Sequence, residues 1–319
     1  MLKIFFALLF VLAPMGHSIL GSRQAPMLSG LVEQGKLPPV DDRLPDEPMV
    51  VEPVKTIGKY GGTWRRVAVQ ISDTSLSTRM AYEPLVRWDR TGKRVVPGIA
   101  KSWEVLDGGR RYIFHLRKGM RWSDGHPFTS QDFLFFHQDV LTHDEFAGNL
   151  AGNTLLVVQG QVGKIETPDP YIVEYHFAEP YGIFLERLAF RGTQVNLFAP
   201  KHYLQTFHPS YSDSDELEKR VRQKGFHTWT QFFEGLGESD PLANPDLPTV
   251  APYTLTIGPP AMQMVAQRNP YYWKVDPEGN QLPYIDRITF TMVQNQEIAN
   301  FKAMTGDVDF QARRMNAAN

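Results

Sequence analysis

The 319-residue chain contains no cysteine. It therefore cannot form a disulfide, use a thiolate as a nucleophile, or hold zinc or an iron–sulfur cluster through sulfur ligands. It also lacks the residue to which the lipid of a bacterial lipoprotein is attached. These exclusions leave an unlipidated protein that must fold without covalent cross-links.

An excess of charge of one sign is also missing. The 33 Lys and Arg residues nearly balance the 35 Asp and Glu residues, the formal net charge is −2, and the two signs are interspersed. Nucleic-acid-binding proteins concentrate basic residues on one face, so we expect no nucleic-acid partner. The hydrophobic fraction of 42% is ordinary for a globular protein, and the length suits about two domains.

Long apolar runs are absent beyond the N-terminus. Lys3 provides a short basic region, residues 4–15 form an apolar run, and small residues follow before Ser22. This order predicts a cleaved signal peptide over residues 1–21. The apolar run is shorter than the ~20 residues that a transmembrane helix needs, although an uncleaved N-terminal anchor is the alternative. The mature protein is predicted to be exported to the periplasm and not to be a lipoprotein.

Recognisable catalytic and cofactor motifs are missing too. The sequence has no Gly-x-Ser-x-Gly elbow, no His-Glu-x-x-His pair, and no phosphate loop, because residues 160–164 lack the required spacing. We therefore predict no enzymatic activity, no cofactor and no metal site. His137 falls on an apolar helical stripe and is predicted to be a hydrogen-bonded core residue. Two further groups are close in sequence without a zinc pattern: His143, Asp144 and Glu145, and His202 with His208.

Proline divides the chain after the signal peptide. Residues 28–35 can form one short helix that ends at Gly35, and five prolines follow before residue 54. Proline fixes φ and removes a backbone donor. Residues 22–57 are therefore predicted to be an extended arm on the surface of the main domain.

The middle of the chain contains clear helix and strand signals. The turn Asp107-Gly108-Gly109 predicts a hairpin whose return strand is Tyr112–Leu116. Thr129 or Ser130 is the expected cap of the next helix, with Asp132 in its first turn. Apolar stripes and paired patterns further predict helices over 183–190, 213–224 and from Thr228, and paired strands over 162–165 and 171–177.

The end of the chain predicts a strand–helix–strand unit. Residues 286–293 form the first strand, with apolar or β-branched residues on both faces, as in a sheet that is buried on both sides. Asn295 caps the helix, Gly306 ends it, and residues 308–311 form the second strand. The two strands should be parallel with a right-handed crossover.

Six segments, in order, resemble family 5 of the extracellular solute-binding proteins, the group that includes oligopeptide, dipeptide, nickel and cello-oligosaccharide binders. The resemblance implies an α/β, periplasmic binding protein-like fold (type II, cluster C) with mixed sheets and two lobes. The matching segments are AYEPLVRWD (81–89), residues 95–135, APKHYL (199–204), APYTL (251–255), residues 267–286 and GDVDF (306–310).

The same resemblance predicts the domain organisation. Residues 58–290 would be the first lobe, with an inserted subdomain at about 81–165, and residues 291–319 would begin the second lobe. On this comparison most of the second lobe is missing, so we expect a fragment, a truncated gene or a shortened chain.

The resemblance also indicates where a ligand would bind. Residues 63–70 are predicted to be a strand, and the segment after it, Ile71, Ser72, Asp73, Thr74 and Ser75, matches the family segment whose backbone lines the cleft; the alternative is a plain surface loop. Phe146 and Asn149 fall where relatives contact ligand; the alternative for Phe146 is the core. The aromatic cluster at residues 271–273 is predicted to be scaffold.

The resulting hypothesis is the substrate-binding component of an ABC importer. Its expected partners are a peptide, or else an oligosaccharide, and the permease subunits of the inner membrane, and the complete protein should be a monomer. A secreted hydrolase and the non-functional remnant of an interrupted gene are the alternatives.

Overall fold

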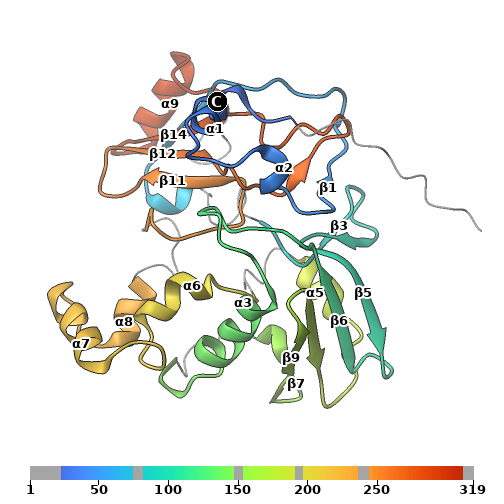
Figure 1. Cartoon of the computed structure of the whole chain (residues 1–319). Coiled ribbons are helices and arrows are strands. Elements are labelled where there is room, and N and C mark those ends of the chain that lie inside the picture. Colours follow the sequence, from blue (N-terminus) through green and yellow to red (C-terminus); the bar gives the residue numbers. More distant parts are fainter. Residues whose placement is uncertain (1–22, 75–81, 147–153, 191–196, 236–243, 312–319) are drawn as a thin grey trace, which may run out of the picture.

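A computed structural model describes residues 23–74, 82–146, 154–190, 197–235 and 244–311 of the chain. Figure 1 shows two parts, one above the other. The upper part combines the N-terminal arm with the C-terminal third of the chain, and the middle of the chain forms the lower part. Each part has its own four-stranded sheet.

The upper sheet contains the only parallel pair of strands in either four-stranded sheet of the described residues. Its order is β11 (Tyr253–Ile257), β12 (Gln263–Arg268), β14 (Arg287–Met292) and β2 (Thr63–Ala68). The first three strands are antiparallel, whereas β14 and β2 run parallel. The small core on this sheet consists of the fully buried side chains of Met264, Ala266, Ile288 and Phe290.

Strand β14 corrects one prediction. Ile288 and Phe290 are buried, but Arg287 is exposed and Thr289 and Thr291 are partly exposed. Apolar or β-branched residues on both faces predict burial on both faces, but only one face of β14 is buried. The β-branched threonines instead satisfy the strand preference on a partly solvated face, because β-branched residues suit strands on either side of a sheet.

The unit after β14 is only partly as predicted. Asn295 caps helix α9 (Gln296–Met304), accepting a hydrogen bond from Ile298 N at 3.0 Å. The prediction of a strand over 308–311 is wrong. That segment lies beside β2, where Asp309 N donates to Arg65 O at 3.0 Å and the Gln311 side chain bonds both backbone groups of Val67. A side-chain amide thus occupies the position that a backbone ladder would take.

The lower sheet is entirely antiparallel. Its order is β5 (Ala100–Leu106), β6 (Arg111–Leu116), β10 (Ile172–His176) and β9 (Lys164–Asp169). The β5–β6 hairpin and the β9–β10 pair are confirmed. Strand β10 lies past the predicted end of the inserted subdomain, residue 165; the domain boundaries themselves stay predictions.

Helices pack against the inner face of the lower sheet. Helix α3 (Ser130–Phe135) continues into a π-helical turn, η4 (Phe136–Leu141). Thr129 is confirmed as its cap, in a capping box with Asp132. The sheet and these helices share one large core. The remaining helices of this part are α5 (Phe184–Ala189), α6 (Lys201–Leu204), η8 (Gln205–Phe207), α7 (Ser214–Gln223) and α8 (Trp229–Phe233).

Short elements complete the chain. Two pairs of short strands are β3 (Val86–Trp88) with β4 (Val95–Pro97), and β7 (Val157–Val158) with β8 (Gln161–Val162). The other short elements outside the arm are η2 (Ile71–Thr74), η5 (Asp144–Phe146), η6 (Thr154–Leu156) and β13 (Lys274–Val275).

The N-terminal arm lies on the upper part and is more regular than predicted. It contains η1 (Pro26–Leu28), α1 (Ser29–Glu33), α2 (Val40–Arg43) and β1 (Met49–Val50), and β1 pairs in parallel with β13. Pro38, Pro39, Pro45 and Pro48 stand between these elements, where a missing backbone donor does no harm. The Arg43 guanidinium is fully buried and holds the arm down. It donates to Pro38 O, Gln24 Oε1, Gln281 Oε1 and Pro270 O.

A buried ion pair connects β13 to the segment before β3. Lys274 Nζ lies 2.6 Å from Glu83 Oε2, and the Tyr272 hydroxyl donates to the other oxygen of the same carboxylate at 2.6 Å. The Trp273 ring is fully buried beside them. Tyr272 and Trp273 are therefore scaffold, as predicted.

Candidate functional site

The carboxyl ends of the two parallel strands of the upper sheet lie side by side. Met292 at the end of β14 is the register partner of Ala68 at the end of β2, and Val293 N donates to Ala68 O at 2.9 Å. In open sheets with parallel strands, ligands bind outside the carboxyl ends of the strands. The segment that leaves β2 at this edge is η2, which contains Ile71, Ser72 and Asp73 of the predicted site residues together with Thr74.

Asp73 fixes the shape of this turn. Its side chain is 1% exposed, and its Oδ2 accepts hydrogen bonds from Val69 N at 3.3 Å and Gln70 N at 3.2 Å. Its own N–H donates to Gln70 O at 3.0 Å. A carboxylate that satisfies the backbone donors of its own turn is a local brace. Asp73 therefore shapes the loop and does not reach toward solvent.

Ile71 and Ser72 are the outward-facing residues of η2. Ile71 is 37% exposed and Ser72 is exposed, whereas Thr74 is fully buried. The Gln70 amide donates to Ser72 Oγ at 2.8 Å, which holds that side chain against its own turn. In Figure 1, η2 is the cyan turn below β11, on the side of the upper part that faces the lower part. Ser75 lies outside the described residues.

Arg66 braces the same turn from the sheet. Its Nη1 donates to Thr74 O at 3.0 Å, and its guanidinium lies 5.1 Å from the Trp64 ring and 5.3 Å from the Phe290 ring. Stacking a guanidinium on aromatic faces stabilises it where water is scarce. The turn is thus tied to the upper core, and sequence reasoning did not find this residue because its three contacts come from two strands and a loop.

Arg65 and Asp309 form an exposed pair on the outer edge of β2. Arg65 Nη2 lies 2.7 Å from Asp309 Oδ1, and hydrogen bonds from the Arg65 side chain and backbone hold the pKa of Asp309 below its usual value. The pair is open to solvent, which screens it. Its role in the structure is to fix the segment after α9 beside β2.

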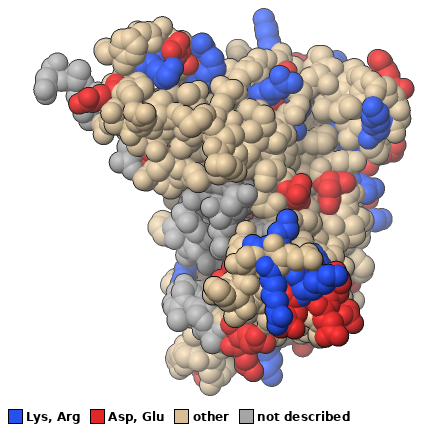
Figure 2. Space-filling view, turned by 90° about the vertical axis from the view of Figure 1, so that its left-hand side faces the viewer, with Lys and Arg blue, Asp and Glu red and all other residues tan. Residues whose placement is uncertain are grey.

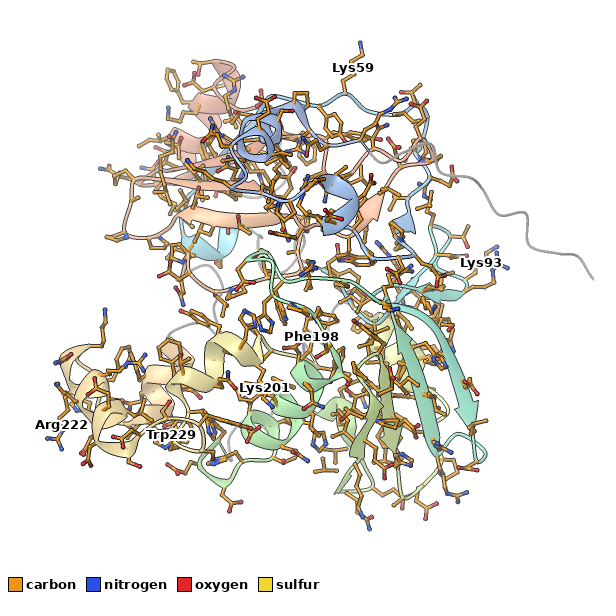
Figure 3. The ribbon with its side chains drawn as sticks, in the orientation of Figure 1. Lys59, Lys93, Phe198, Lys201, Arg222 and Trp229 are labelled. Atoms are coloured by element: carbon orange, nitrogen blue, oxygen red, sulfur yellow. The ribbon has the colours of Figure 1, made fainter. Side chains whose placement is uncertain are left out.

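Phe146 lies elsewhere. It is 3% exposed in the lower core, with ring centroids 5.0 Å from Trp229 and 5.4 Å from Phe233. Figure 3 shows Trp229 on α8, at the lower left. The structure therefore does not bring Phe146 together with η2, and its burial agrees with the core alternative. Asn149 lies outside the described residues.

Three histidines of the lower part, His137, His208 and His202, have structural partners. His137 is confirmed as a core residue: its Nε2 lies 2.8 Å from Gly163 O, and burial lowers its pKa. His208 is fully buried, its Nε2 lies 3.1 Å from Asp139 O, and burial lowers its pKa as well. His202 pairs with Asp124 at 2.7 Å and stacks on His126 at 3.9 Å. The sequence separates Asp124 from His202 too widely for this contact to be predicted.

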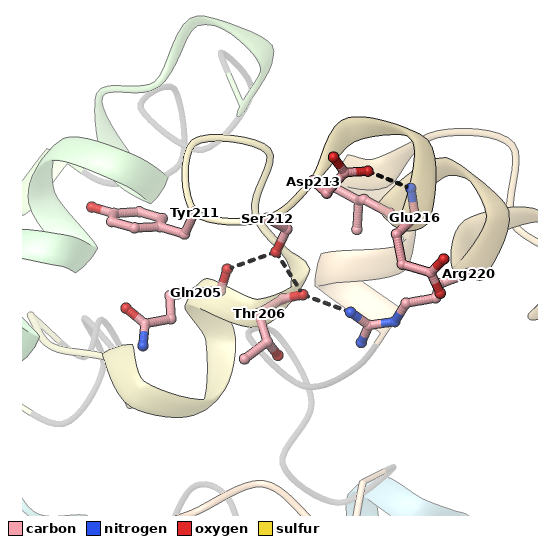
Figure 4. A pocket seen from close by; sticks show the side chains of 8 residues that line it. Gln205, Thr206, Tyr211, Ser212, Asp213, Glu216 and Arg220 are labelled. Atoms are coloured by element: carbon pink, nitrogen blue, oxygen red, sulfur yellow. Dashed lines mark hydrogen bonds between the residues drawn. The ribbon is translucent and has the colours of Figure 1, made fainter.

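A shallow hollow of about 400 Å³ lies beside α7 (Figure 4). Its polar groups already bond one another: Thr206 O accepts from Arg220 Nη1 at 2.8 Å and from Ser212 Oγ at 3.0 Å. Asp213 Oδ1 caps α7 by accepting from Glu216 N at 3.0 Å. Because these groups are engaged, few remain to orient a ligand, and the hollow is a weaker candidate than η2.

Charge is unevenly distributed over the face that contains α7. Figure 2 shows charged side chains of both signs gathered at the bottom of this face, where α7 lies, while the upper part is mostly uncharged. No helix in the described ranges has the length and apolar character needed to cross a bilayer.

The fold and the loop at the strand ends define the class: an α/β lobe of the periplasmic binding protein type, with mixed sheets. The chain belongs to family 5 of the bacterial extracellular solute-binding proteins, whose middle region ("Bacterial extracellular solute-binding proteins, family 5 Middle") matches residues 94–318. Proteins of this family serve ABC importers and are periplasmic.

Relatives of this chain are named for different solutes. The chain is 30% identical over 283 residues to a periplasmic alpha-galactoside-binding protein of Rhizobium meliloti (strain 1021), covering 82% of this chain and 38% of that protein. A solved oligopeptide-binding protein OppA superposes with a TM-score of 0.83 at 42% identity, covering 94% of this chain and 46% of the other.

A second solved structure is the binding protein MelB from Agrobacterium fabrum C58, in complex with stachyose. It superposes with a TM-score of 0.72 at 26% identity, and the match covers 92% of this chain and 44% of MelB. The chain thus spans less than half the length of the relatives it matches. These relatives are solute-binding proteins, not enzymes.

Proposed function

We propose that this chain supplies a ligand-contacting wall of a substrate-binding protein for an ABC importer, and that η2 is the part of the wall that touches the ligand. The observation that carries the proposal is the position of η2 at the carboxyl edge of β2 and β14, with Asp73 buried as a brace and Ile71 and Ser72 facing outward. No chemical change of the ligand is part of this function.

A peptide is the first ligand class. An extended peptide can pair its backbone with the backbone of a fixed loop, which gives affinity while tolerating different side chains. The bracing by Asp73 and Arg66 keeps the η2 backbone in one shape, so little ordering entropy is lost on binding. The likeness to OppA supports this class.

An oligosaccharide is the second class. It is favoured by the resemblance to an alpha-galactoside-binding protein and to a protein solved with stachyose. Sugars are held by hydrogen bonds from side chains and by aromatic faces. A sugar ligand would therefore depend on the Ser72 hydroxyl as well as on the backbone of η2.

The proposal includes export and a membrane partner. The first 21 residues, which lie outside the described ranges, would act as a cleaved signal peptide, and the mature protein would act in the periplasm and deliver its ligand to permease subunits. The absence of cysteine leaves no site for a lipid anchor.

A matched pair of variants separates the two ligand classes. Ser72→Pro removes the backbone N–H and the hydroxyl, whereas Ser72→Ala removes the hydroxyl alone. Calorimetry with short peptides and with α-galactoside oligosaccharides should show, for a peptide ligand, affinity lost in Ser72→Pro and kept in Ser72→Ala. For a sugar ligand held by the hydroxyl, both variants should lose affinity.

Unchanged affinity in both variants would show that η2 does not contact the ligand. If the wild-type chain binds neither the peptides nor the oligosaccharides, the whole proposal is contradicted. Catalytic turnover of any peptide or glycoside by the purified chain would favour a hydrolase instead.

A further inference from the structure

The outer face of the lower sheet carries a cluster of potential metal ligands that is separate from η2. Glu166 on β9 and Glu174 on β10 are register partners, and His176 stands two residues further along β10 on the same face. One ligand atom from each of the three side chains lies within 4.8 Å of the others. The two strands thus bring one imidazole and two carboxylates together.

The separations fit a metal ion. His176 Nε2 lies 3.3 Å from Glu174 Oε2 and 3.8 Å from Glu166 Oε2. With metal–ligand distances of about 2.0–2.2 Å and a tetrahedral angle, two zinc ligands are about 3.3–3.6 Å apart. The His176–Glu174 separation already meets this value. Glu166 needs only a small rotation, and its side chain is 67% exposed and able to move.

The imidazole nitrogen is an independent indication. His176 Nε2 is shielded from solvent yet has no hydrogen-bond partner among the described residues, although it faces the two carboxylates. A buried nitrogen without a hydrogen bond costs free energy unless a proton or a cation satisfies it. Glu174 is also unusual for the solvent face of a sheet, because its side chain is only 9% exposed.

Neighbouring charges set the limits of the site. Arg111 Nε and Nη2 donate to Glu174 Oε2 at 2.9 and 2.7 Å, which fixes that carboxylate in place but also puts a positive charge next to it. Lys164 is the cross-strand partner of His176 and adds a second positive charge. An ion here would therefore be held with moderate affinity.

We propose that Glu166, Glu174 and His176 bind a divalent transition-metal ion of the zinc type, with solvent in the remaining coordination position. Imidazole ligation favours zinc-like ions over magnesium and calcium, which prefer oxygen ligands alone. The ion would clip β9 to β10 on the face opposite the core. This site is independent of the ligand wall at η2.

The test is calorimetric titration of the tag-free chain with ZnCl2 at neutral pH. Wild type should bind zinc with a dissociation constant in the micromolar range, and His176→Gln and Glu166→Gln should each weaken binding at least tenfold. Both residues lie outside the core, and circular dichroism with thermal melting would verify that the variants fold. Zinc should raise the melting temperature of wild type and not that of His176→Gln.

Two other histidines provide matched controls. His115 faces Glu104 at 2.9 Å on the same sheet, with no second carboxylate paired to it among the described residues, and His202 pairs with Asp124 and stacks on His126. His115→Gln and His202→Gln should bind zinc like wild type. The proposal is overturned if either control loses the site, if His176→Gln binds normally, if magnesium competes equally with zinc, or if wild type does not bind below millimolar zinc.

Discussion

Arg43 shows how one buried side chain can hold a whole segment. Its guanidinium is completely buried and donates to acceptors on the arm and on the segment around β13, and burial lowers its pKa to about 10. The cost of burying the charge is offset only while these acceptors are in place. Arg43 therefore determines whether the arm stays on the upper part.

Replacing Arg43 by Met should destabilise the protein by about 3 kcal/mol, because buried carbonyl oxygens lose their donors. Urea unfolding measures the difference. Arg23→Met is the control: Arg23 is exposed and lies 3.9 Å from Glu278, so its loss should change stability by less than about 0.5 kcal/mol. Equal effects of the two substitutions would contradict the anchoring role of Arg43.

Asp132 makes stability depend on pH. Its carboxylate accepts hydrogen bonds from Thr129 N at 2.9 Å, Trp122 Nε1 at 3.2 Å and Lys201 N at 3.2 Å, yet burial raises its pKa from 3.8 to about 6. The folded state therefore holds this proton more tightly than the unfolded state. The resulting stabilisation is complete below about pH 4 and is lost as the pH rises through about 6.

The comparison with Asp132→Asn isolates this effect, because asparagine does not titrate. The unfolding free energy of wild type minus that of the variant should fall by about 2 kcal/mol between pH 4 and pH 7. Urea unfolding at the two pH values measures it. A difference that stays constant or rises with pH would show that the hydrogen bonds outweigh burial.

Residues whose role is set by their neighbours in sequence were predictable, and the others were not. Thr129 as a cap and His137 as a core residue follow from local pattern. Arg43, Arg66 and the Lys274–Glu83 pair depend on partners that are brought close only by the fold. Of the predicted site residues, Ile71, Ser72 and Asp73 share one turn, but the sequence could not tell that Asp73 points inward as a brace.

Among the elements, the turn of the β5–β6 hairpin allows the cost of an unfavourable backbone conformation to be measured without a packing cost. Its turn has positive φ at Asp107 (51°), Gly108 (63°) and Gly109 (87°). A Cβ added at Gly108 would meet no atom within 4 Å, so only backbone strain opposes it. This separates the conformational cost of a turn residue from any packing cost.

Gly108→Ala should therefore destabilise the protein by about 1 kcal/mol. Gly182 also has open space around its Cβ position but does not have positive φ, and Gly182→Ala is expected to be neutral or slightly stabilising. Thermal melting of the two variants compares them. A loss of the same size in both would mean that side-chain space, and not φ, governs these positions.

Elements that are specified by residues close together in the sequence were predicted correctly, whereas the edge of the upper sheet was not. The hairpin, the capped helices α3, α7, α8 and α9, and the β9–β10 pair follow from turn residues, caps and periodicity. The strand expected over 308–311 does not form: this segment makes one backbone bond to β2, from Asp309 N to Arg65 O, and is otherwise held by the side chains of Asp309 and Gln311. Periodicity cannot distinguish a backbone partner from a side-chain partner.

On the scale of the whole molecule, α9 leaves an apolar stripe uncovered. Ile298, Phe301 and Met304 are 36%, 61% and 79% exposed, and their spacing of three places them on one side of the helix. Contiguous exposed apolar surface favours association. We expect the chain as printed to self-associate through this helix as its concentration rises.

The double substitution Phe301→Gln and Met304→Gln should abolish this association without lowering the melting temperature, because both side chains are mostly exposed. Sedimentation velocity over a concentration series measures it. Val54→Gln, which changes an isolated residue that is 85% exposed, should leave association unchanged. A wild-type sedimentation coefficient that does not depend on concentration would disprove the expectation.

The family resemblance in the sequence anticipated the architecture, because six ordered segments fix a fold more firmly than any single pattern. The solute class could not be read in the same way, since backbone recognition leaves little trace in side-chain identity. The central claim is therefore a spatial one: solute contacts the chain at the carboxyl edge of β2 and β14.

The most direct test is amide chemical-shift mapping of the isotope-labelled chain during titration with short peptides and with α-galactoside oligosaccharides. The account predicts that one of the two classes shifts the amides of residues 69–74 and of the adjoining ends of β2 and β14, with few changes elsewhere. Shifts centred on another surface, such as the hollow beside α7, or no shifts with either class, would contradict it.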